Sequence, residues 1–400
     1  MKFRVTMVAL CAIASASGAQ AQKKYGPQGV SDTEIKIGQT MPYSGPASAY
    51  GIEGRAQAAF FQMLNETKGG VNGRKIKFIS LDDAFSPPKT VEQTRKLVED
   101  DGVFMTFSSI GTAAQSAVQK YLNTRKVPQL MLSTGASKFN APKTFPFTTP
   151  ILHLYPTEGE AYAQYLLDTK PGAKIAILMQ NDDFVRDFVK GFKARLGDKA
   201  AQMIVKEETF EIADPTVDSQ VLALKASGAD VLFDASLGKQ TGQILKKLSE
   251  IDWKPLHIVV STSVGRPILQ AAGLDKATGI ITATPYKQID EPAYANDPDV
   301  LAYKALMQKY SPNDDPNNSI GFIAWSWANV LAKLIESCGD ELTPENIVAK
   351  ATTMRNVQSP ALLPGITYNT TPTDYAPIKK LRIQTFTGET WTPIRDVSVD

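Results

Sequence analysis

The 400-residue sequence has little cysteine, little histidine and almost no net charge. With 2 Cys and 2 His, the composition argues against a disulfide framework and against a zinc site. Lys and Arg number 43 and Asp and Glu 41, and the two extra positive charges are Lys2 and Arg4. The remainder is formally neutral, so neither nucleic acid nor an anionic membrane surface is expected as a partner. Cys338 ends an apolar helical stretch and is expected to be a buried structural thiol.

Long hydrophobic runs are also missing beyond the N-terminus. No later segment reaches 18 apolar residues, so we expect no direct membrane anchor. At the N-terminus, two basic residues precede the apolar stretch 5–16, and Ala19-Gln20-Ala21 has the small-x-small pattern that a signal peptidase recognises. We predict that residues 1–21 are a signal peptide cleaved after Ala21, and that the mature protein is exported.

Catalytic motifs are absent as well. The sequence contains no G-x-S-x-G elbow, no H-E-x-x-H and no G-x-G-x-x-G. His153 and His257 lie far from each other and from any cysteine at metal-binding spacing. We therefore expect no enzyme activity, no metal and no cofactor. An exported enzyme stays open as an alternative of another class, and turnover instead of stoichiometric capture would reveal it.

From residue 34 onward, short apolar runs alternate with longer amphipathic stretches. Strands are predicted at 34–40, 75–81, 103–107, 129–132, 174–179, 231–233, 257–260 and 279–284, with a hairpin at 378–386 and 391–394. Helices are predicted at 54–67, 88–101, 112–123, 158–167, from 183, and at 240–250, 267–272, 299–310, 320–335 and 344–351. This alternation predicts mostly parallel sheets with helices on both faces. The four prolines in 139–157 interrupt the pattern like a linker, so we predict two similar α/β lobes with a ligand between them.

Three turns rich in small residues follow strands, at 42–51, 108–114 and 133–137. Small residues give a ligand access to backbone N–H groups, and a helix start presents unpaired donors that favour a carboxylate. Ordinary helix capping and tight turns use the same residues, so that interpretation stays open for each turn. Together the three turns favour a binding site at one edge of the first sheet.

These turns carry a resemblance to a known family. The segment Tyr43-Ser44-Gly45-Pro46-Ala47, the turns at 109–112 and 133–137, and Gln180-Asn181-Asp182-Asp183-Phe184 are similar to the branched-chain amino-acid (Leu/Ile/Val) binding proteins of ABC importers. The resemblance covers nearly all of the mature chain. It implies a periplasmic, monomeric binding protein that serves the membrane permease of an ABC transporter.

The resemblance also implies the fold and the domain division. The expected fold is α/β, with two Rossmann-like lobes (periplasmic binding protein type I, Venus flytrap) joined by a three-segment hinge. The chain would cross between the lobes near Pro150, Pro285 and Pro364. The expected division is lobe one at 31–150 plus 286–362 and lobe two at 151–285 plus 363–400.

Residue by residue, the resemblance implies a ligand carboxylate held by lobe one. Tyr50 falls where an aromatic residue covers the ligand, and Phe184 where lobe two usually presents Tyr. Tyr286 is equally compatible with hinge packing, and Arg266 with either a second anion anchor or a surface charge. Trp325 and Trp327 are expected to be packing residues. The residues expected to contact the ligand are Tyr50, Ser109, Ile110, Gly111, Thr112, Thr134, Gly135, Ser137, Phe184, Ser236, Ser263 and Tyr286.

Two departures from the family pattern bear on the ligand. Ser263 occupies the position where amino-acid binders commonly carry an acid for the ammonium group, and Phe184-Val185 replaces Tyr-Gly. Since a buried unpaired ammonium costs several kcal/mol, we expect a small-molecule carboxylate with an apolar or aromatic body and no amino group. An amino-acid binder with its acid elsewhere, such as Asp234 or Glu291, stays open, as does a binding protein that reports to a sensor.

Overall fold

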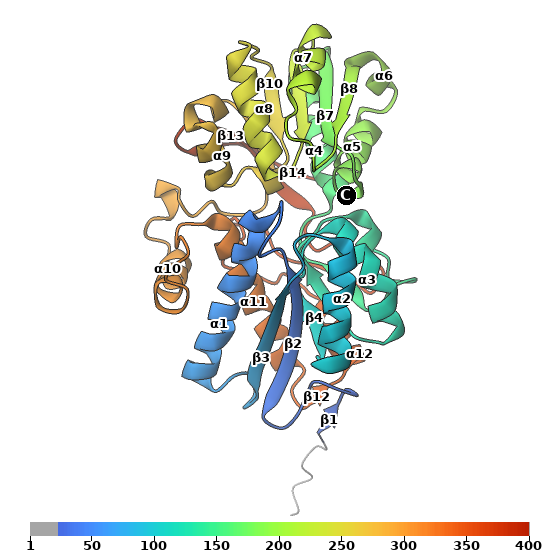
Figure 1. The fold of residues 1–400 in the computed structure, drawn as a ribbon, viewed down its shortest axis with the longest axis vertical. Coiled ribbons are helices and arrows are strands. Elements are labelled where there is room, and N and C mark those ends of the chain that lie inside the picture. The colour runs from blue at the N-terminus through green and yellow to red at the C-terminus, as the bar shows by residue number, and fades with distance from the viewer. Residues whose placement is uncertain (1–22, 400) are drawn as a thin grey trace, which may run out of the picture.

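The protein is described by a computed structural model covering residues 23–399, so the predicted signal peptide lies outside the described residues. Two lobes lie one above the other, each built on its own sheet (Figure 1). The two-lobe α/β fold predicted from the sequence is confirmed. The predicted boundaries 31–150 plus 286–362 and 151–285 plus 363–400 remain a prediction.

Lobe one is built on a parallel sheet with the strand order β3-β2-β4-β5-β6. Its strands are β2 (Glu34–Met41), β3 (Lys75–Asp82), β4 (Met105–Phe107), β5 (Gln129–Leu132) and β6 (Thr148–Pro150). Its helices are α1 (Ile52–Lys68), α2 (Pro87–Arg95), α3 (Thr112–Thr124), α10 (Pro298–Tyr310), α11 (Ser319–Ser337) and α12 (Pro344–Ala351). β2 is flanked on both sides and buries Ile35 and Ile37 completely, as expected for a strand covered on both faces. Cys338 is buried beyond the end of α11, as predicted.

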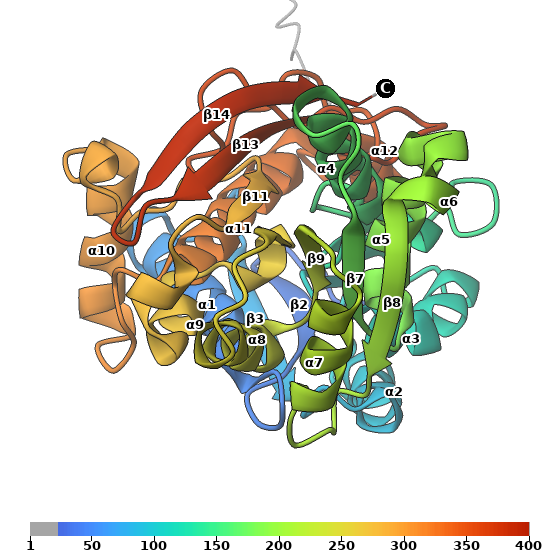
Figure 2. The ribbon, with the colours of Figure 1, turned by 90° about the horizontal axis from the view of Figure 1, so that it is seen from above.

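Lobe two is built on a seven-stranded sheet with the order β14-β13-β11-β10-β9-β7-β8. Its strands are β7 (Ile175–Gln180), β8 (Ile204–Phe210), β9 (Val231–Ala235), β10 (Leu256–Val259), β11 (Ile281–Thr284), β13 (Lys380–Phe386) and β14 (Trp391–Ser398). Its helices are α4 (Tyr155–Thr169), α5 (Asp183–Leu196), α6 (Ala200–Met203), α7 (Asp218–Ala226), α8 (Gly238–Glu250) and α9 (Arg266–Ala272). The C-terminal strands β13 and β14 form the predicted hairpin, which joins the sheet antiparallel to β11 (Figure 2).

The chain passes between the two sheets three times. It leaves lobe one after β6, returns after β11, and leaves again between α12 and β13. The second and third passages run side by side, because the Leu363 N–H donates to the Pro285 carbonyl at 2.8 Å and Tyr286 pairs with Leu362. The predicted crossing points at Pro285 and Pro364 therefore lie next to each other in space.

Several elements have no counterpart in the sequence interpretation, among them β6, β8 and α7. Strand β6 lies inside the region 139–157 that was interpreted as a linker, because a three-residue Thr-Thr-Pro strand carries no periodicity. Strand β8 is an edge strand whose Lys-Glu-Glu stretch is mostly exposed, so it lacks an apolar pattern. Helix α7 is nine residues long and buries only two of them. The helix predicted at 88–101 is α2, which continues as one π-helical turn at Lys96–Asp100.

Candidate ligand-binding cavity between the lobes

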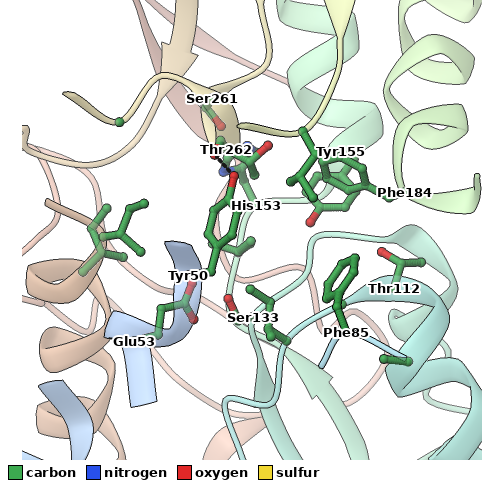
Figure 3. A pocket seen from close by; sticks show the side chains of 18 of the residues that line it. Tyr50, Glu53, Phe85, Thr112, Ser133, His153, Tyr155, Phe184, Ser261 and Thr262 are labelled. Atoms are coloured by element: carbon green, nitrogen blue, oxygen red, sulfur yellow. Dashed lines mark hydrogen bonds between the residues drawn. The ribbon is translucent and has the colours of Figure 1, made fainter. Parts of the chain in front are cut away.

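A cavity of about 340 Å³ lies between the two lobes. Lobe one contributes the loops after its strands and residues of α1, α2, α3 and α11, lobe two contributes the loops after β7, β8, β9 and β10, and the crossing segments also line the cavity (Figure 3). The residues that line it include Tyr50, Glu53, Phe85, Gly111, Thr112, Ser133, His153, Tyr155, Asp182, Phe184, Ser261, Thr262, Tyr286, Ile320, Ile323 and Trp327. A cavity of this size accommodates a small organic molecule. No Lys or Arg stands among the lining residues of the part of the chain described here.

The first turn of α3 forms the polar part of the lobe-one wall. Gly111 precedes the helix with a φ of 101°, a conformation that favours glycine, and an added Cβ there would lie 2.8 Å from the Phe85 ring. Within residues 23–399, the backbone N–H groups of Thr112, Ala113 and Ala114 have no hydrogen-bond acceptor. Free N–H groups at the positive end of a helix dipole are donors for an anion such as a carboxylate.

The Thr112 hydroxyl adds a further donor to this wall. It lies 2.9 Å from the Thr134 hydroxyl, whose oxygen also accepts the Ala136 N–H at 3.3 Å. When Thr134 donates to Thr112, the proton of the Thr112 hydroxyl is free to bind a ligand oxygen. Thr134 itself is buried behind Thr112 and does not line the cavity.

The remaining walls are largely aromatic and aliphatic. Tyr155 packs edge-to-face against Phe184 with ring centroids 5.2 Å apart, and Phe85 faces them from lobe one (Figure 3). Trp327 is buried in the core, as expected for a packing residue, and its indole N–H donates to the Tyr368 hydroxyl at 3.1 Å, but it also lines the cavity. Such walls suit a ligand with a flat or aliphatic apolar body.

Contacts between the lobes hold the cavity closed. Tyr50 lies in the short 3-10 helix Ser48–Gly51 before α1, and its hydroxyl donates to the Thr262 carbonyl of lobe two at 3.0 Å (Figure 3). On the other side, the backbone N–H and the hydroxyl of Ser137 both donate to the Asp187 carboxylate of α5, at 2.6 and 3.0 Å. Lys138 adds an exposed ion pair with Asp183 at 3.0 Å. The structure therefore represents a closed arrangement of the lobes.

Glu53, in the first turn of α1, is an acidic cavity residue that sequence reasoning missed. Its side chain is buried, with 4% of the residue exposed, and burial raises the pKa of its carboxyl to about 8, the nearby Ser133 hydroxyl acting in the opposite direction. Within residues 23–399, its Oε2 atom has no hydrogen-bond partner. A buried oxygen of this kind is a vacant hydrogen-bonding position inside the cavity.

A second buried network stands behind the cavity at the first crossing segment. The Glu158 carboxylate accepts hydrogen bonds from the Tyr162 hydroxyl at 2.6 Å and from the N–H and hydroxyl of Ser261, both at 2.7 Å. His153 Nε2 lies beside the same carboxylate, and His153 Nδ1, on the ring that lines the cavity, has no partner in the part of the chain described here. This network ties the crossing segment to α4 and to the loop after β10.

The structure brings together half of the residues predicted to contact a ligand. Those that line the cavity are Tyr50, Ile110, Gly111, Thr112, Phe184 and Tyr286. Those that do not are Ser109, Thr134, Gly135, Ser137, Ser236 and Ser263. The role of all twelve in ligand binding stays a prediction.

The six residues away from the cavity have other partners. The Ser109 hydroxyl accepts the Thr40 N–H at 3.0 Å, and Gly135 packs against the His153 carbonyl, where a Cβ would come within 2.1 Å. The Ser236 hydroxyl pairs with Thr241 at 2.6 Å. The Ser263 hydroxyl donates to the Ser236 carbonyl at 2.6 Å and accepts the Gly238 N–H. Ser137 and Thr134 make the contacts described above.

The charged residues singled out in the sequence also lie elsewhere. Asp234 lies 3.2 Å from His257 Nε2, and Glu291 accepts the Trp391 N–H at 3.0 Å, neither of them at the cavity. Arg266 pairs with Asp290 at 3.2 Å, away from the cavity wall. The acids at the wall are Glu53 and Asp182, whose two oxygens accept from the Val185 N–H and the Gln180 side chain.

Over residues 23–399, no group of three or more His, Cys, Asp or Glu side chains is arranged to hold a metal ion. None of the helices of this range is long and apolar enough to cross a membrane.

Two α/β lobes, three chain crossings and a cavity between the lobes define a two-lobe binding protein. Residues 34–390 match the family model described as periplasmic binding protein, and the chain belongs to this family. The family is one of binding proteins, and not of enzymes.

Relatives and solved structures agree with the family. The chain is 24% identical over 328 residues to a leucine-, isoleucine-, valine-, threonine- and alanine-binding protein of Pseudomonas aeruginosa, covering 82% of this chain and 84% of the relative. It resembles the structure of a branched chain amino acid ABC transporter protein of Thermus thermophilus with bound valine, with a TM-score of 0.81 and 18% identity over 92% of this chain and 98% of the other. It also resembles a solute binding protein of Rhodopseudomonas palustris in complex with 3,4-dihydroxy benzoic acid, with a TM-score of 0.75 and 19% identity, again over 92% and 98%.

Proposed function

We propose that this protein is the solute-binding component of an ABC-type importer in the periplasm. It captures a small carboxylate with an apolar or aromatic body and no amino group, and delivers it to a membrane permease. The observation that carries the proposal is the pairing of free N–H groups at the start of α3 with aromatic and aliphatic walls. The ligand carboxylate accepts from the Thr112 region, and the apolar body lies between Phe85, Phe184 and Trp327.

The charge of the cavity favours a ligand without an ammonium group. The two acids at the wall are Asp182, whose oxygens are occupied within lobe two, and Glu53, whose burial favours the neutral form. A neutral Glu53 does not repel a ligand carboxylate. No wall cation is needed, since the helix start supplies donors for the negative charge.

Closure follows from contacts that exist only when the lobes meet. A ligand shifts an open–closed equilibrium only by binding the closed form better. Here a ligand held by Thr112 of lobe one gains contacts with Phe184 and the Ser261–Thr262 segment of lobe two on closure. The Tyr50–Thr262 hydrogen bond forms at the same time.

An amino-acid ligand is the second proposal, and one specific observation favours it. Within residues 23–399, one buried oxygen of Glu53 at the cavity has no hydrogen-bond partner, so an ionised Glu53 can accept a hydrogen bond from an ammonium group. The relative from Pseudomonas aeruginosa is named for amino acids. Against it stands the cost of ionising Glu53 in a site where burial raises its pKa.

A thermal-shift screen of residues 22–400 tests the proposal. A ligand at 100 times its dissociation constant adds about 2.7 kcal/mol to the free energy of unfolding, which gives a clear rise in melting temperature. The panel contains aromatic acids, fatty and dicarboxylic acids, and the amino acids. We expect stabilisation by carboxylates that lack an amino group. Stabilisation by leucine and its kin alone would replace the first proposal with the second.

A further inference from the structure

Glu53 is a buried acid at the cavity, and the binding of a carboxylate at the start of α3 does not involve it. It stands in the first turn of α1, and its Oε2 atom is buried without a partner within the described residues. Figure 3 shows the carboxyl of Glu53 directed toward Ser133 and the cavity, on the opposite side of the view from Thr112. A ligand held by its carboxylate at Thr112 therefore extends its other end toward Glu53.

No Lys or Arg side chain of the described residues lines the cavity around Glu53. The titratable side chains on which the charge of an ionised Glu53 acts are Tyr50 before α1, Tyr155 of α4 and Tyr286 of the second crossing segment. His153 lines the same cavity from the first crossing segment. The aliphatic and aromatic side chains of Ile320, Ile323 and Trp327 on α11 complete this end of the cavity. An ionised Glu53 would thus face an anionic ligand with no basic Lys or Arg side chain at the described wall.

A neutral carboxyl has a distinct recognition chemistry. Its O–H donates a hydrogen bond and its carbonyl oxygen accepts one. An alcohol or phenol hydroxyl also donates and accepts, so the two groups match each other. A methyl or ring C–H at the same place would leave the buried carboxyl oxygen unpaired, which costs free energy.

We propose that Glu53 determines specificity by hydrogen-bonding, as the neutral acid, to a hydroxyl on the apolar body of the bound carboxylate. The ligand class is then hydroxylated carboxylic acids, with the carboxylate at Thr112 and the hydroxyl at Glu53. This inference rests on the proposed function and narrows it. The Ser133 hydroxyl, beside Glu53 at the cavity wall, orients the carboxyl.

The experiment compares matched pairs of probes by titration calorimetry at pH 6.5. The pairs are 4-hydroxybenzoate with benzoate and 4-hydroxyphenylacetate with phenylacetate. The proteins are the wild type, Glu53→Gln, which keeps a donor and an acceptor, and Glu53→Met, which keeps the length without polarity. We expect the wild type to bind at least one hydroxylated probe about tenfold or more tightly than its parent. Glu53→Gln keeps most of this preference, and Glu53→Met binds both members of a pair within about twofold.

An equal preference in the wild type and Glu53→Met overturns the inference, as does a wild type that binds parent and hydroxylated probe equally. In both cases the proposed function stands, because carboxylates still bind. If leucine binds, no probe does, and Glu53→Gln abolishes leucine binding, then Glu53 accepts an ammonium group and the first proposed function fails as well.

A second measurement serves if Glu53→Met does not fold. Ionisation of Glu53 removes the donor and adds a repelling charge, so affinity of the wild type for the hydroxylated probe falls up to tenfold per pH unit above about pH 8. Glu53→Gln cannot ionise at this position and shows a flat profile up to about pH 9, below the range in which the phenol of the probe itself ionises. A wild-type profile as flat as that of the variant overturns the inference.

Discussion

The contact between Ser137 and Asp187 predicts a loss of affinity from a residue that does not touch the ligand. Asp187 lies on α5 of lobe two, and its carboxylate accepts both the backbone N–H and the hydroxyl of Ser137 in lobe one. A hydrogen bond to a charged group contributes about 1.5–3 kcal/mol. Because both residues are half-buried and water replaces part of the lost bonding, we assign about 1.5–3 kcal/mol to the pair together.

Asp187→Ala removes this contribution from the closed form alone. Since about 1.4 kcal/mol corresponds to a factor of ten, the dissociation constant should rise about 10- to 150-fold. The assay is titration calorimetry with the carboxylate that stabilises the wild type most strongly. Small-angle scattering of the same samples should show a smaller closed fraction in the variant at a fixed ligand concentration.

Asp183→Ala is the matched control. Asp183 lies one turn earlier on α5 and also reaches lobe one, through an ion pair with Lys138 in which both side chains are about half exposed. Exposed pairs contribute about 0–1 kcal/mol, so this variant should lose no more than about fivefold in affinity. If Asp187→Ala binds as tightly as the wild type, the contact does not stabilise the ligand-bound form, and the reasoning about closure is wrong.

Three further predictions concern the cavity and its surroundings. Thr112→Ala should weaken carboxylate binding by about 1–3 kcal/mol in calorimetry, whereas Thr112→Ser should bind nearly as tightly as the wild type. Equal affinities of all three proteins would show that the Thr112 hydroxyl does not bind the carboxylate. Ser263→Asp should lower the melting temperature without improving binding of a carboxylate that lacks an ammonium group, because the new charge would be buried where Ser263 now bonds to the Ser236 carbonyl. Burial raises the pKa of Glu53 from 4.5 to about 8, so the ligand-free protein should lose on the order of 5 kcal/mol between pH 4.5 and pH 8 from this group. Urea unfolding of wild type and Glu53→Gln at pH 5 and 8.5 measures the difference, and identical pH dependence would show that Glu53 is not buried as described.

Periodicity was sufficient for most of the fold. The apolar runs of β5 and β7 are buried on both faces of their sheets, so their hydrophobicity is visible in the sequence. Strand β8 was not predicted, because an edge strand with Lys206, Glu207 and Glu208 needs no apolar alternation.

The candidate site was predictable only where local sequence decides geometry. The turn at Gly111 and Thr112 is recognisable in the sequence because small residues precede a helix, and it lines the cavity. Glu53 was missed because a single acid in the first turn of an amphipathic helix has the sequence signature of a favourable dipole interaction. Only the packing of α1 against the crossing segments and α11 encloses it. Ser263 was predicted to contact the ligand from its position in the chain alone. Its side chain instead donates to the Ser236 carbonyl, a contact that the sequence does not reveal.

The central claim is that the cavity holds a carboxylate without an amino group. The most direct measurement is titration calorimetry of residues 22–400 at pH 6.5, with the most stabilising non-amino acid of the screen and with leucine on the same preparation. We predict that one carboxylate binds per chain, that only other carboxylates without an amino group displace it, and that leucine gives no heat of binding. One leucine bound per chain, with no binding of the non-amino acids, would contradict it.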